Sequence, residues 1–357
     1  MKRRFLALLA ACLIALGVLA DRLVSLSLTQ PSTVAAATTS SSTSTTTSSI
    51  DQATEQAYAT ASKSVVYIVS SGVGSGSGII YDSKGDIVTN NHVIEGATSI
   101  SVTLNNGKTY SATVVGTDTT DDLAVIHINA SNLTPATFAT AGSYQVGQTV
   151  LAIGNPLDLK GSVTSGLISG LHRVEQESNG AYLSDAVQTS APINPGNSGG
   201  ALVTLDGTVV GMPTLEQTSS SNGTTAQDIG FAIPSERIVS IANQIIATGK
   251  VTHTGRAYLG ISPSDASSQS GGGFFPGQTT PTTSGALVSQ VASSGPAAKA
   301  GVQQGDVITA VDGTSITDAQ DLLTILAQKK PGDTITLKID RNGSTLTVQV
   351  QLGELPA

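Results

Sequence analysis

The stretch INPGNSGGAL, Ile193–Leu202, surrounds Ser198 with glycines, asparagines and a proline. A flexible linker or a structural turn would have a similar composition, but apolar segments flank this stretch on both sides. Such a loop can present a reactive hydroxyl and direct its own backbone N–H groups to one point, because glycine tolerates unusual φ angles. A serine hydroxyl becomes an effective nucleophile only when a base removes its proton. The chemistry therefore requires a histidine, and a carboxylate that orients it.

The base is expected to be His92, which ends the apolar run IVTNNHVI just where a loop begins. The carboxylate is expected to be Asp122, which immediately precedes the buried-looking strand LAVIHI, whereas Asp121 should point to the other side. His92, Asp122 and Ser198 then follow the chain order of the chymotrypsin triad.

The other three histidines have less suitable surroundings. His127 lies within the alternating strand LAVIHI and should be exposed. His172 and His253 lie in polar loop or linker contexts. The spacing of His and Cys predicts no metal site, and no cofactor is expected.

Most of the chain between Ser64 and Pro234 consists of short β-type runs separated by Gly, Asn and Asp at intervals near ten residues. Dipeptides such as Asp206-Gly207 and Asn342-Gly343 are hairpin signals. The pattern predicts a sandwich or a barrel. The glycines of GVGSGSG (72–78) lead into another strand, not a helix, which argues against a nucleotide-binding loop.

Helical periodicity is expected first at Pro234–Lys250, with Ser235 as the cap and Gly249 as the stop. A second unit then follows, with strands YLGISP and GALVSQV, a helix capped by Thr317 and a final hairpin. Residues 265–283, rich in Gly, Ser, Thr and Pro, are expected to form a mobile inserted loop.

The composition limits the possible partners. The 357 residues carry 12% charged residues and a net charge of −8, and the part beyond residue 50 is near −11 with 13 Lys and Arg against 24 Asp and Glu. Nucleic acid is not expected as a partner, because its binding needs clustered basic residues. The single cysteine, Cys12, excludes an intrachain disulfide.

The N-terminus predicts export. Lys2, Arg3 and Arg4 precede an apolar run from Phe5 to Ala20, which is typical of a secretory signal or an uncleaved membrane anchor. Residues 1–28 are therefore interpreted as a signal peptide or anchor, and residues 29–50 as a Ser/Thr-rich linker. The protein is expected outside the cytoplasm, anchored by one helix, or secreted or periplasmic if cleaved.

The motifs GSGSGIIYD, IVTNNHVI, DDLAVI, AIGNP, INPGNSGGAL and GFAIP, in this order, resemble the HtrA/DegP-type trypsin-like serine proteases. The segments YLGI, GPAAKAGVQQGDVITAVDG and PGDTITLKIDRNG resemble the PDZ domain of that family. The resemblance implies a mainly β chain. A chymotrypsin-like double β-barrel would span 51–250, and an α+β PDZ domain would span 257–355. It also implies proteolysis of unfolded, misfolded or exported proteins, and a homotrimer.

The resemblance also implies roles for individual residues. His92, Asp122 and Ser198 match the catalytic positions, and the N–H groups of Gly196 and Ser198 would form the oxyanion hole. Ile193 matches a position that lines the primary substrate pocket, so an apolar pocket is expected. The substrate cleft would also include the segment that follows Pro213, namely Thr214, Leu215 and Glu216.

The PDZ resemblance assigns the binding of C-terminal peptides to the YLGI segment: Tyr258, Leu259, Gly260 and Ile261. The other wall of the groove would be the helix Asp318–Gln328, with Leu322, Leu323 and Leu326 as candidates for apolar contacts. The alternative hypothesis is a chaperone or peptide-binding scaffold that does not cleave its ligands. Labelling of Ser198 by a fluorophosphonate would separate the two.

Overall fold

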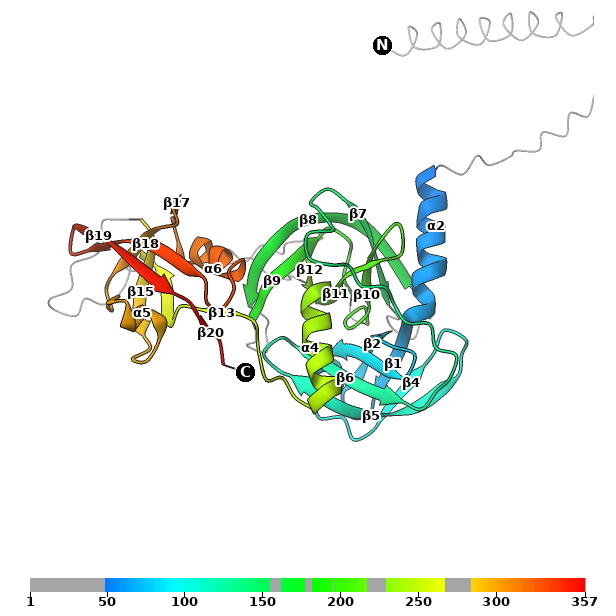
Figure 1. Ribbon diagram of the computed structural model, residues 1–357. Helices are drawn as coiled ribbons and strands as arrows, with labels where there is room; N and C mark the ends of the chain where they lie inside the picture. Colours follow the sequence, from blue (N-terminus) through cyan, green and yellow to red (C-terminus); the bar gives the residue numbers. More distant parts are fainter. Residues whose placement is uncertain are drawn as a thin grey trace, which may run out of the picture. The chain divides into compact units, whose positions relative to one another are not determined.

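The computed structural model describes residues 49–154, 162–176, 182–194, 196–216, 229–266 and 284–356 (Figure 1). The expected signal or anchor at 1–28, most of the linker at 29–50 and most of the loop at 265–283 lie outside the described residues. Among the described helices, none has the length and apolar composition needed to cross a membrane.

The first half of the protease region is a closed six-stranded antiparallel barrel. Its order is β1-β2-β3-β6-β5-β4, so β3 pairs with β6 and not with the next strand along the chain. The interior contains aliphatic side chains such as Ile68, Ile87 and Ile126, all fully buried. The strands are β1 (Val65–Ser70), β2 (Gly74–Ile80), β3 (Asp86–Asn90), β4 (Ile100–Thr103), β5 (Thr109–Asp118) and β6 (Leu123–Ile128).

The second half forms another closed barrel, with the order β10-β11-β12-β9-β8-β7. The two barrels share a core in which Ile79 and Leu123 of the first pack with Leu151 and Met212 of the second. The strands are β7 (Thr149–Gly154), β8 (Ser162–Gln176), β9 (Tyr182–Thr189), β10 (Ala201–Thr204), β11 (Val209–Glu216) and β12 (Gly230–Pro234). The predicted mainly β double barrel is confirmed.

Two longer helices pack against the shared core. The first, α2 (Ser49–Ala61), was not expected, because we predicted no helix before residue 234; it buries only the small side chains Ala57 and Ala61. The second, α4 (Ser235–Thr248), buries Ile238, Ile241 and Ile245, and ends at Gly249 with φ 77, as predicted. The short helices are η1 (Ser62–Ser64) and α3 (Asn91–Ile94).

Both predicted serine and threonine caps are wrong. The hydroxyl of Ser235 donates instead to the carbonyl of Ala139, because Ser235 is buried inside the domain, and the N-cap position of α4 is Pro234. The helix near residue 320 is capped by the Asp318 carboxylate, which accepts from the N–H of Asp321, while the Thr317 hydroxyl donates to the Asp321 side chain.

The C-terminal unit is an α+β domain with its own core, around Leu322, Ile335 and Leu337. Its main sheet has the order β14-β15-β16-β18-β19, and the β18–β19 hairpin turns at Asn342 and Gly343, both with positive φ, as the sequence predicted. The elements are β13 (Ala257–Tyr258), β14 (Ile261–Asp265), β15 (Ala286–Val291), α5 (Pro296–Lys299), β16 (Val307–Val311), β17 (Thr314–Ser315), α6 (Ala319–Ala327), β18 (Thr334–Arg341), β19 (Ser344–Gln351) and β20 (Gly353–Glu354).

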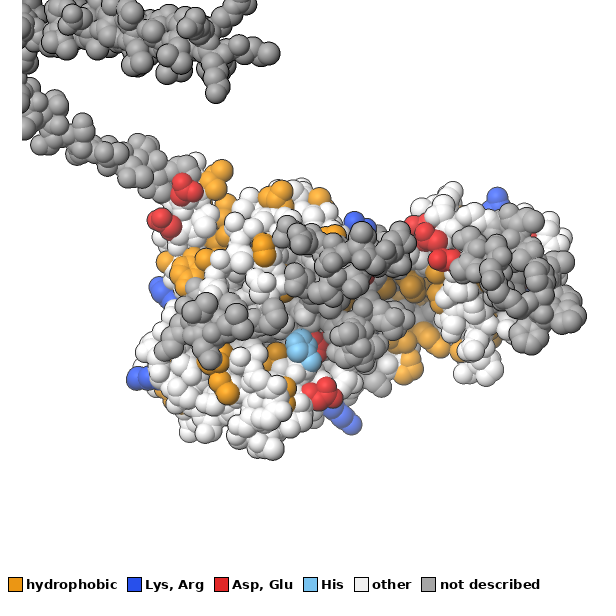
Figure 2. Space-filling view, turned by 180° about the vertical axis from the view of Figure 1, so that it is seen from behind, with side chains coloured by type: hydrophobic (Ala, Val, Ile, Leu, Met, Phe, Trp, Pro, Cys, Tyr) orange, Lys and Arg blue, Asp and Glu red, His pale blue; other side chains and the backbone are white. Residues whose placement is uncertain are grey.

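The surface carries few charges. On the face drawn in Figure 2, lysine and arginine side chains are scattered singly among neutral polar atoms and do not gather over any one element.

Candidate active site

Asp122 and His92 form a closely held pair at the end of the first barrel. Asp122 follows β5 and directly precedes β6, while His92 lies in α3, directly after β3. The distance from His92 Nδ1 to Asp122 Oδ2 is 2.7 Å, and the backbone N–H of His92 donates to Asp122 Oδ1 at 2.9 Å. With the carboxylate as the acceptor, Nδ1 is assigned as the protonated ring nitrogen, and Nε2 is then the ring nitrogen with the lone pair that a base needs.

The backbone around Asp122 fixes this carboxylate. Asp122 has φ 49, a left-handed conformation that residues other than glycine seldom adopt. Its carbonyl accepts from the Asn91 N–H at 3.0 Å and from the Asn90 side-chain amide at 3.1 Å. Such strained backbone persists only where the surroundings determine it, and it is frequent at active sites.

All four histidines pair with a carboxylate, so pairing alone does not identify the base. The partners of His127, His172 and His253 are Asp86, Asp185 and Glu354, whose side chains are 10%, 33% and 34% exposed. Asp122 is only 1% exposed, so its charge is the most shielded from water. The side chain of His127 is 41% exposed and the residue as a whole is half-buried, so the predicted exposure is met only in part.

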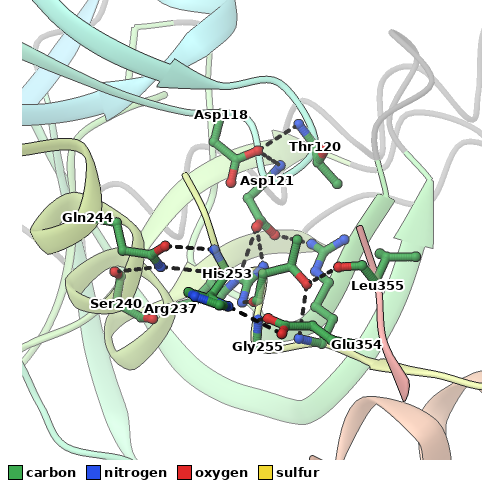
Figure 3. Close-up of polar contacts among 12 residues, drawn as sticks. Asp118, Thr120, Asp121, Arg237, Ser240, Gln244, His253, Gly255, Glu354 and Leu355 are labelled. Atoms are coloured by element: carbon green, nitrogen blue, oxygen red, sulfur yellow. Dashed lines mark hydrogen bonds and ion pairs between the residues drawn. The ribbon is translucent and has the colours of Figure 1, made fainter. Parts of the chain in front are cut away.

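Asp121 points away from the pair, as predicted, although both aspartates lie in the turn between β5 and β6. Its carboxylate accepts from Arg237 of α4 and from Arg256, which lies between α4 and β13. Figure 3 shows Asp121 beside Arg237 and next to Asp118, in the cluster that also includes Glu354 and Gly255. Burial lowers the pKa of Arg256 more than the charge of Asp121 raises it.

Ser198 lies in a turn of the second barrel, before β10, and this turn contacts strand β2 of the first barrel. The carbonyl of Ser198 accepts from the backbone N–H of Ser77 at 2.9 Å. A Cβ atom added at Gly76 would lie 2.8 Å from the Val93 side chain and 3.4 Å from Ser198 O. The turn therefore lies at the junction of the barrels, beside the helix that carries His92.

Glycine is required next to Ser198. Gly199 has φ 78, and a Cβ atom there would lie 2.2 Å from the carbonyl oxygen of Ser77 and 2.4 Å from the hydroxyl of Thr89. Such contacts cannot be relieved without moving backbone, so the turn fits against the first barrel only with glycine at this position.

Comparisons with known proteins agree with this architecture. The trypsin-like peptidase family model matches residues 76–212, and a PDZ family model matches residues 257–352. The chain is 41% identical to the serine protease Do-like HtrA of Lactobacillus helveticus, over 78% of this chain and 68% of that protein. It is 39% identical to the serine endoprotease DegS of Escherichia coli K12, over 79% and 77%.

The chain belongs to the HtrA family of serine proteases. An HtrA-type protease solved with a decapeptide aligns with a TM-score of 0.59 and 32% identity, covering 85% of this chain and 99% of that one. The resemblance read from the sequence motifs is thus confirmed for the family, the enzyme class and the fold.

Within this HtrA protease, Thr214 makes a contact that was not predicted. Its side chain is buried, and its hydroxyl donates to Asp122 Oδ2 at 2.8 Å. The expected position of Thr214 in the substrate cleft stays a prediction, and its hydroxyl contacts the carboxylate from the second barrel. The side chains of Leu215 and Glu216 lie outside the described residues. No signal in the sequence indicated the contact, because it joins positions 92 residues apart.

Ile193 and Gly230 lie against each other on the second barrel. Ile193 is 3% exposed, and a Cβ atom added at Gly230 would lie 2.4 Å from its Cγ1 and 3.4 Å from a methyl of Thr189. Gly230 belongs to β12, and β12 pairs with both β9 and β11. The Ile193 side chain therefore occupies the space beside Gly230.

In the PDZ domain, β14 has an edge position. Among the described strands it pairs with β15 alone, so its other side can accept an added strand. Gly260 has φ 82 just before β14, and the carboxylate of Asp265 at its end accepts from the N–H of Ala319 in α6. The edge strand and α6 are therefore tied together at one end.

The other expected PDZ residues divide into buried and half-buried positions. Leu259 and Leu322 are buried in the core of the domain, so their side chains do not line a groove. Leu323 and Leu326 of α6 and Ile261 of β14 are half-buried. Tyr258 belongs to β13 and pairs with Gly353 of β20.

The described ranges contain no group of three His, Cys, Asp or Glu side chains placed to hold a metal ion.

Proposed function

We propose that this HtrA protease is an extracytoplasmic endopeptidase that cleaves unfolded or exported proteins through His92, Asp122 and Ser198. The observation that carries the proposal is the buried Asp122 carboxylate. It accepts from the ring and the backbone of His92 and from Thr214, while the Ser198 turn lies on the same barrel junction.

In the proposed reaction, His92 Nε2 removes the proton of the Ser198 hydroxyl as Oγ attacks the scissile carbonyl carbon. Asp122 stabilises the imidazolium that forms. His92 then gives this proton to the leaving amine as the C–N bond breaks, which leaves an acyl-enzyme on Ser198. Water, deprotonated by the same imidazole, hydrolyses the ester.

The oxyanion is assigned to the backbone N–H groups of Gly196 and Ser198. Gly196 has φ 101, a conformation open to glycine and rarely to other residues. Removal of one such donor typically costs about 3–4 kcal/mol of transition-state stabilisation.

We propose that the primary specificity pocket is apolar, with Ile193 as its wall and Gly230 beside it, and accepts small or medium aliphatic side chains. The contact between these two residues supports this assignment.

We further propose that the PDZ domain binds apolar C-terminal peptides along β14, with the N–H groups of Leu259 to Ile261 near the terminal carboxylate. Structures of an HtrA-type protease with a decapeptide and with a tripeptide support peptide binding in this family. Leu323 and Leu326 are the groove residues of α6 in this assignment.

Export is proposed from residues 1–28, as an anchor or a cleaved signal, with residues 29–50 as the tether. One relative, of Chlamydia muridarum, is named a probable periplasmic endoprotease. The domain limits 51–250 and 257–355, and a homotrimeric assembly, are part of the same proposal. Fractionation of cells expressing the full chain, and light scattering of the purified protein, test location and assembly.

The catalytic assignment is tested with casein as an unfolded substrate. Ser198→Ala and His92→Ala should each lower hydrolysis by several orders of magnitude with the fold intact. His127→Ala and His253→Ala are matched controls that should keep substantial activity, since their carboxylate partners lie elsewhere. Near wild-type hydrolysis by Ser198→Ala would remove the basis of the proposal.

A further inference from the structure

Ser77 makes two donor contacts with the turn that carries the nucleophile, although it belongs to the other barrel. Its hydroxyl donates to the carbonyl of Gly196 at 2.6 Å, and its backbone N–H donates to the carbonyl of Ser198 at 2.9 Å. Ser77 is fully buried, in the middle of β2. Its own carbonyl accepts from the Thr89 hydroxyl at 2.7 Å, which anchors Ser77 to β3.

These two contacts hold the carbonyls of the two residues assigned to the oxyanion hole. Gly196 and Ser198 are the residues whose N–H groups are assigned to the oxyanion, and Ser77 fixes the carbonyl of each one. Between them, the N–H of Asn197 donates to the carbonyl of Asn194 at 2.9 Å, which closes the turn. The turn is therefore held at both ends by one residue of a rigid strand.

The hydroxyl contact matters most at Gly196, because the backbone of a glycine has the greatest conformational freedom. Glycine has no Cβ to restrict φ and ψ, so Gly196 alone does not keep its peptide groups in one orientation. A buried carbonyl also needs a donor, and the Ser77 hydroxyl supplies it. The held carbonyl belongs to the Gly196–Asn197 peptide, which lies between the two assigned N–H donors, so without that hydroxyl, rotation of this peptide would change the relative directions of the two donors.

We propose that Ser77 is a positioning residue for the oxyanion hole, which it preorganises through its hydroxyl from the opposite barrel. The inference rests on the proposed function of Ser198 and Gly196. Ser77 does not touch substrate; it acts through the carbonyl of Gly196. Its effect is expected mainly in kcat, because the oxyanion develops in the transition state and is absent from the bound substrate.

The test compares Ser77→Ala with the matched control Ser70→Ala in the full chain. Ser70 is a buried serine of the adjacent strand β1, and its hydroxyl has no hydrogen-bond partner among the described residues. Both substitutions remove one buried hydroxyl, but only Ser77→Ala removes a contact with the nucleophile turn. The backbone N–H of residue 77 keeps its contact with Ser198 in either variant.

Ser77→Ala should lower kcat about 10- to 100-fold, the range expected for misplaced catalytic groups, with KM within about twofold. Affinity for a peptide boronate, which forms a tetrahedral adduct, should fall by a similar factor. In the Ser198→Ala background, which cannot form the adduct, the affinity for the same peptide should be equal with and without Ser77→Ala. Ser70→Ala should keep wild-type kcat and boronate affinity.

The proposal is overturned if Ser77→Ala keeps kcat within about threefold, if boronate affinity is unchanged, or if Ser70→Ala loses as much. If Ser77→Ala does not fold, as judged by circular dichroism, Ser77→Cys keeps the size with a weaker donor and should show the same loss of kcat. Wild-type enzyme that is never labelled at Ser198 would instead refute the proposed function itself.

Discussion

Replacement of Asp118 by asparagine should stabilise the protease domain at neutral pH. Asp118 ends β5, and its Oδ1 accepts from the N–H groups of Thr120 and Asp121 (Figure 3). Its Oδ2 is buried without a hydrogen-bond partner in the described part of the chain. Burial, and then the charge of Asp121, raise the pKa of Asp118 from 3.8 to about 6.

The raised pKa of Asp118 determines whether the free energy of unfolding increases or decreases with pH. Between about pH 4 and pH 6 the folded protein holds a proton on Asp118 that the unfolded chain has lost, so unfolding releases it. The free energy of unfolding therefore decreases as pH rises through this window. Each tenfold change in proton affinity is worth about 1.4 kcal/mol, so the full effect is about 3 kcal/mol.

An asparagine at position 118 keeps an oxygen for the two N–H donors and removes the buried charge. Asp118→Asn should therefore raise the free energy of unfolding at pH 7 by up to about 3 kcal/mol, or roughly 5–10 °C in Tm, and should flatten the decrease between pH 4 and pH 6. Thermal unfolding followed by circular dichroism at pH 4, 5, 6 and 7 measures both effects.

The control is Glu55→Gln, which removes an exposed carboxyl from α2. It should leave Tm nearly unchanged at every pH. The reasoning is refuted if Asp118→Asn has the wild-type Tm at pH 7 and the same decrease from pH 4 to pH 6.

Three further predictions concern catalysis and peptide binding. Thr214→Val removes a hydrogen-bond donor from Asp122 with little change in shape, so the activation barrier for kcat on a peptide substrate should rise by about 1–2 kcal/mol while KM stays constant. A change confined to KM would indicate instead that Thr214 acts by binding substrate. Gly230→Val should displace Ile193 and shift cleavage, profiled with a peptide library, toward smaller side chains before the scissile bond; an unaltered profile contradicts the pocket assignment. Leu326→Glu should weaken binding of an apolar-ended fluorescent peptide to the full chain at least fivefold by anisotropy, and unchanged affinity would place Leu326 outside the groove.

Many of the strands could be predicted because the residue types that favour them lie within one short segment of the sequence. Runs such as SVVYIVS and LAVIHI combine β-branched residues with flanking turn signals, and they form β1 and β6. Chain order and surroundings singled out His92 and Asp122, since a histidine and an aspartate at the ends of apolar runs lie at strand termini. Their contact at 2.7 Å follows from the pairing of β3 with β6.

The parts that were missed depend on distant contacts or on weak local signals. Helix α2 buries only Ala57 and Ala61, and alanine gives little hydrophobic contrast in a sequence. Thr214 and Ser77 acquire their roles across the barrel junction, from residues 92 and 119 positions away. Ser235 fits the pattern of a helix cap, but burial against Ala139 gives its hydroxyl another partner.

The central claim, that Ser198 is a nucleophile activated by His92, is tested most directly by labelling with a fluorophosphonate and locating the adduct by mass spectrometry. We predict one adduct per chain, on Ser198, formed much more slowly in His92→Ala and at the wild-type rate in His127→Ala. A folded wild-type protein that remains unlabelled with substrate and PDZ peptide present, or one labelled on another serine, would contradict it.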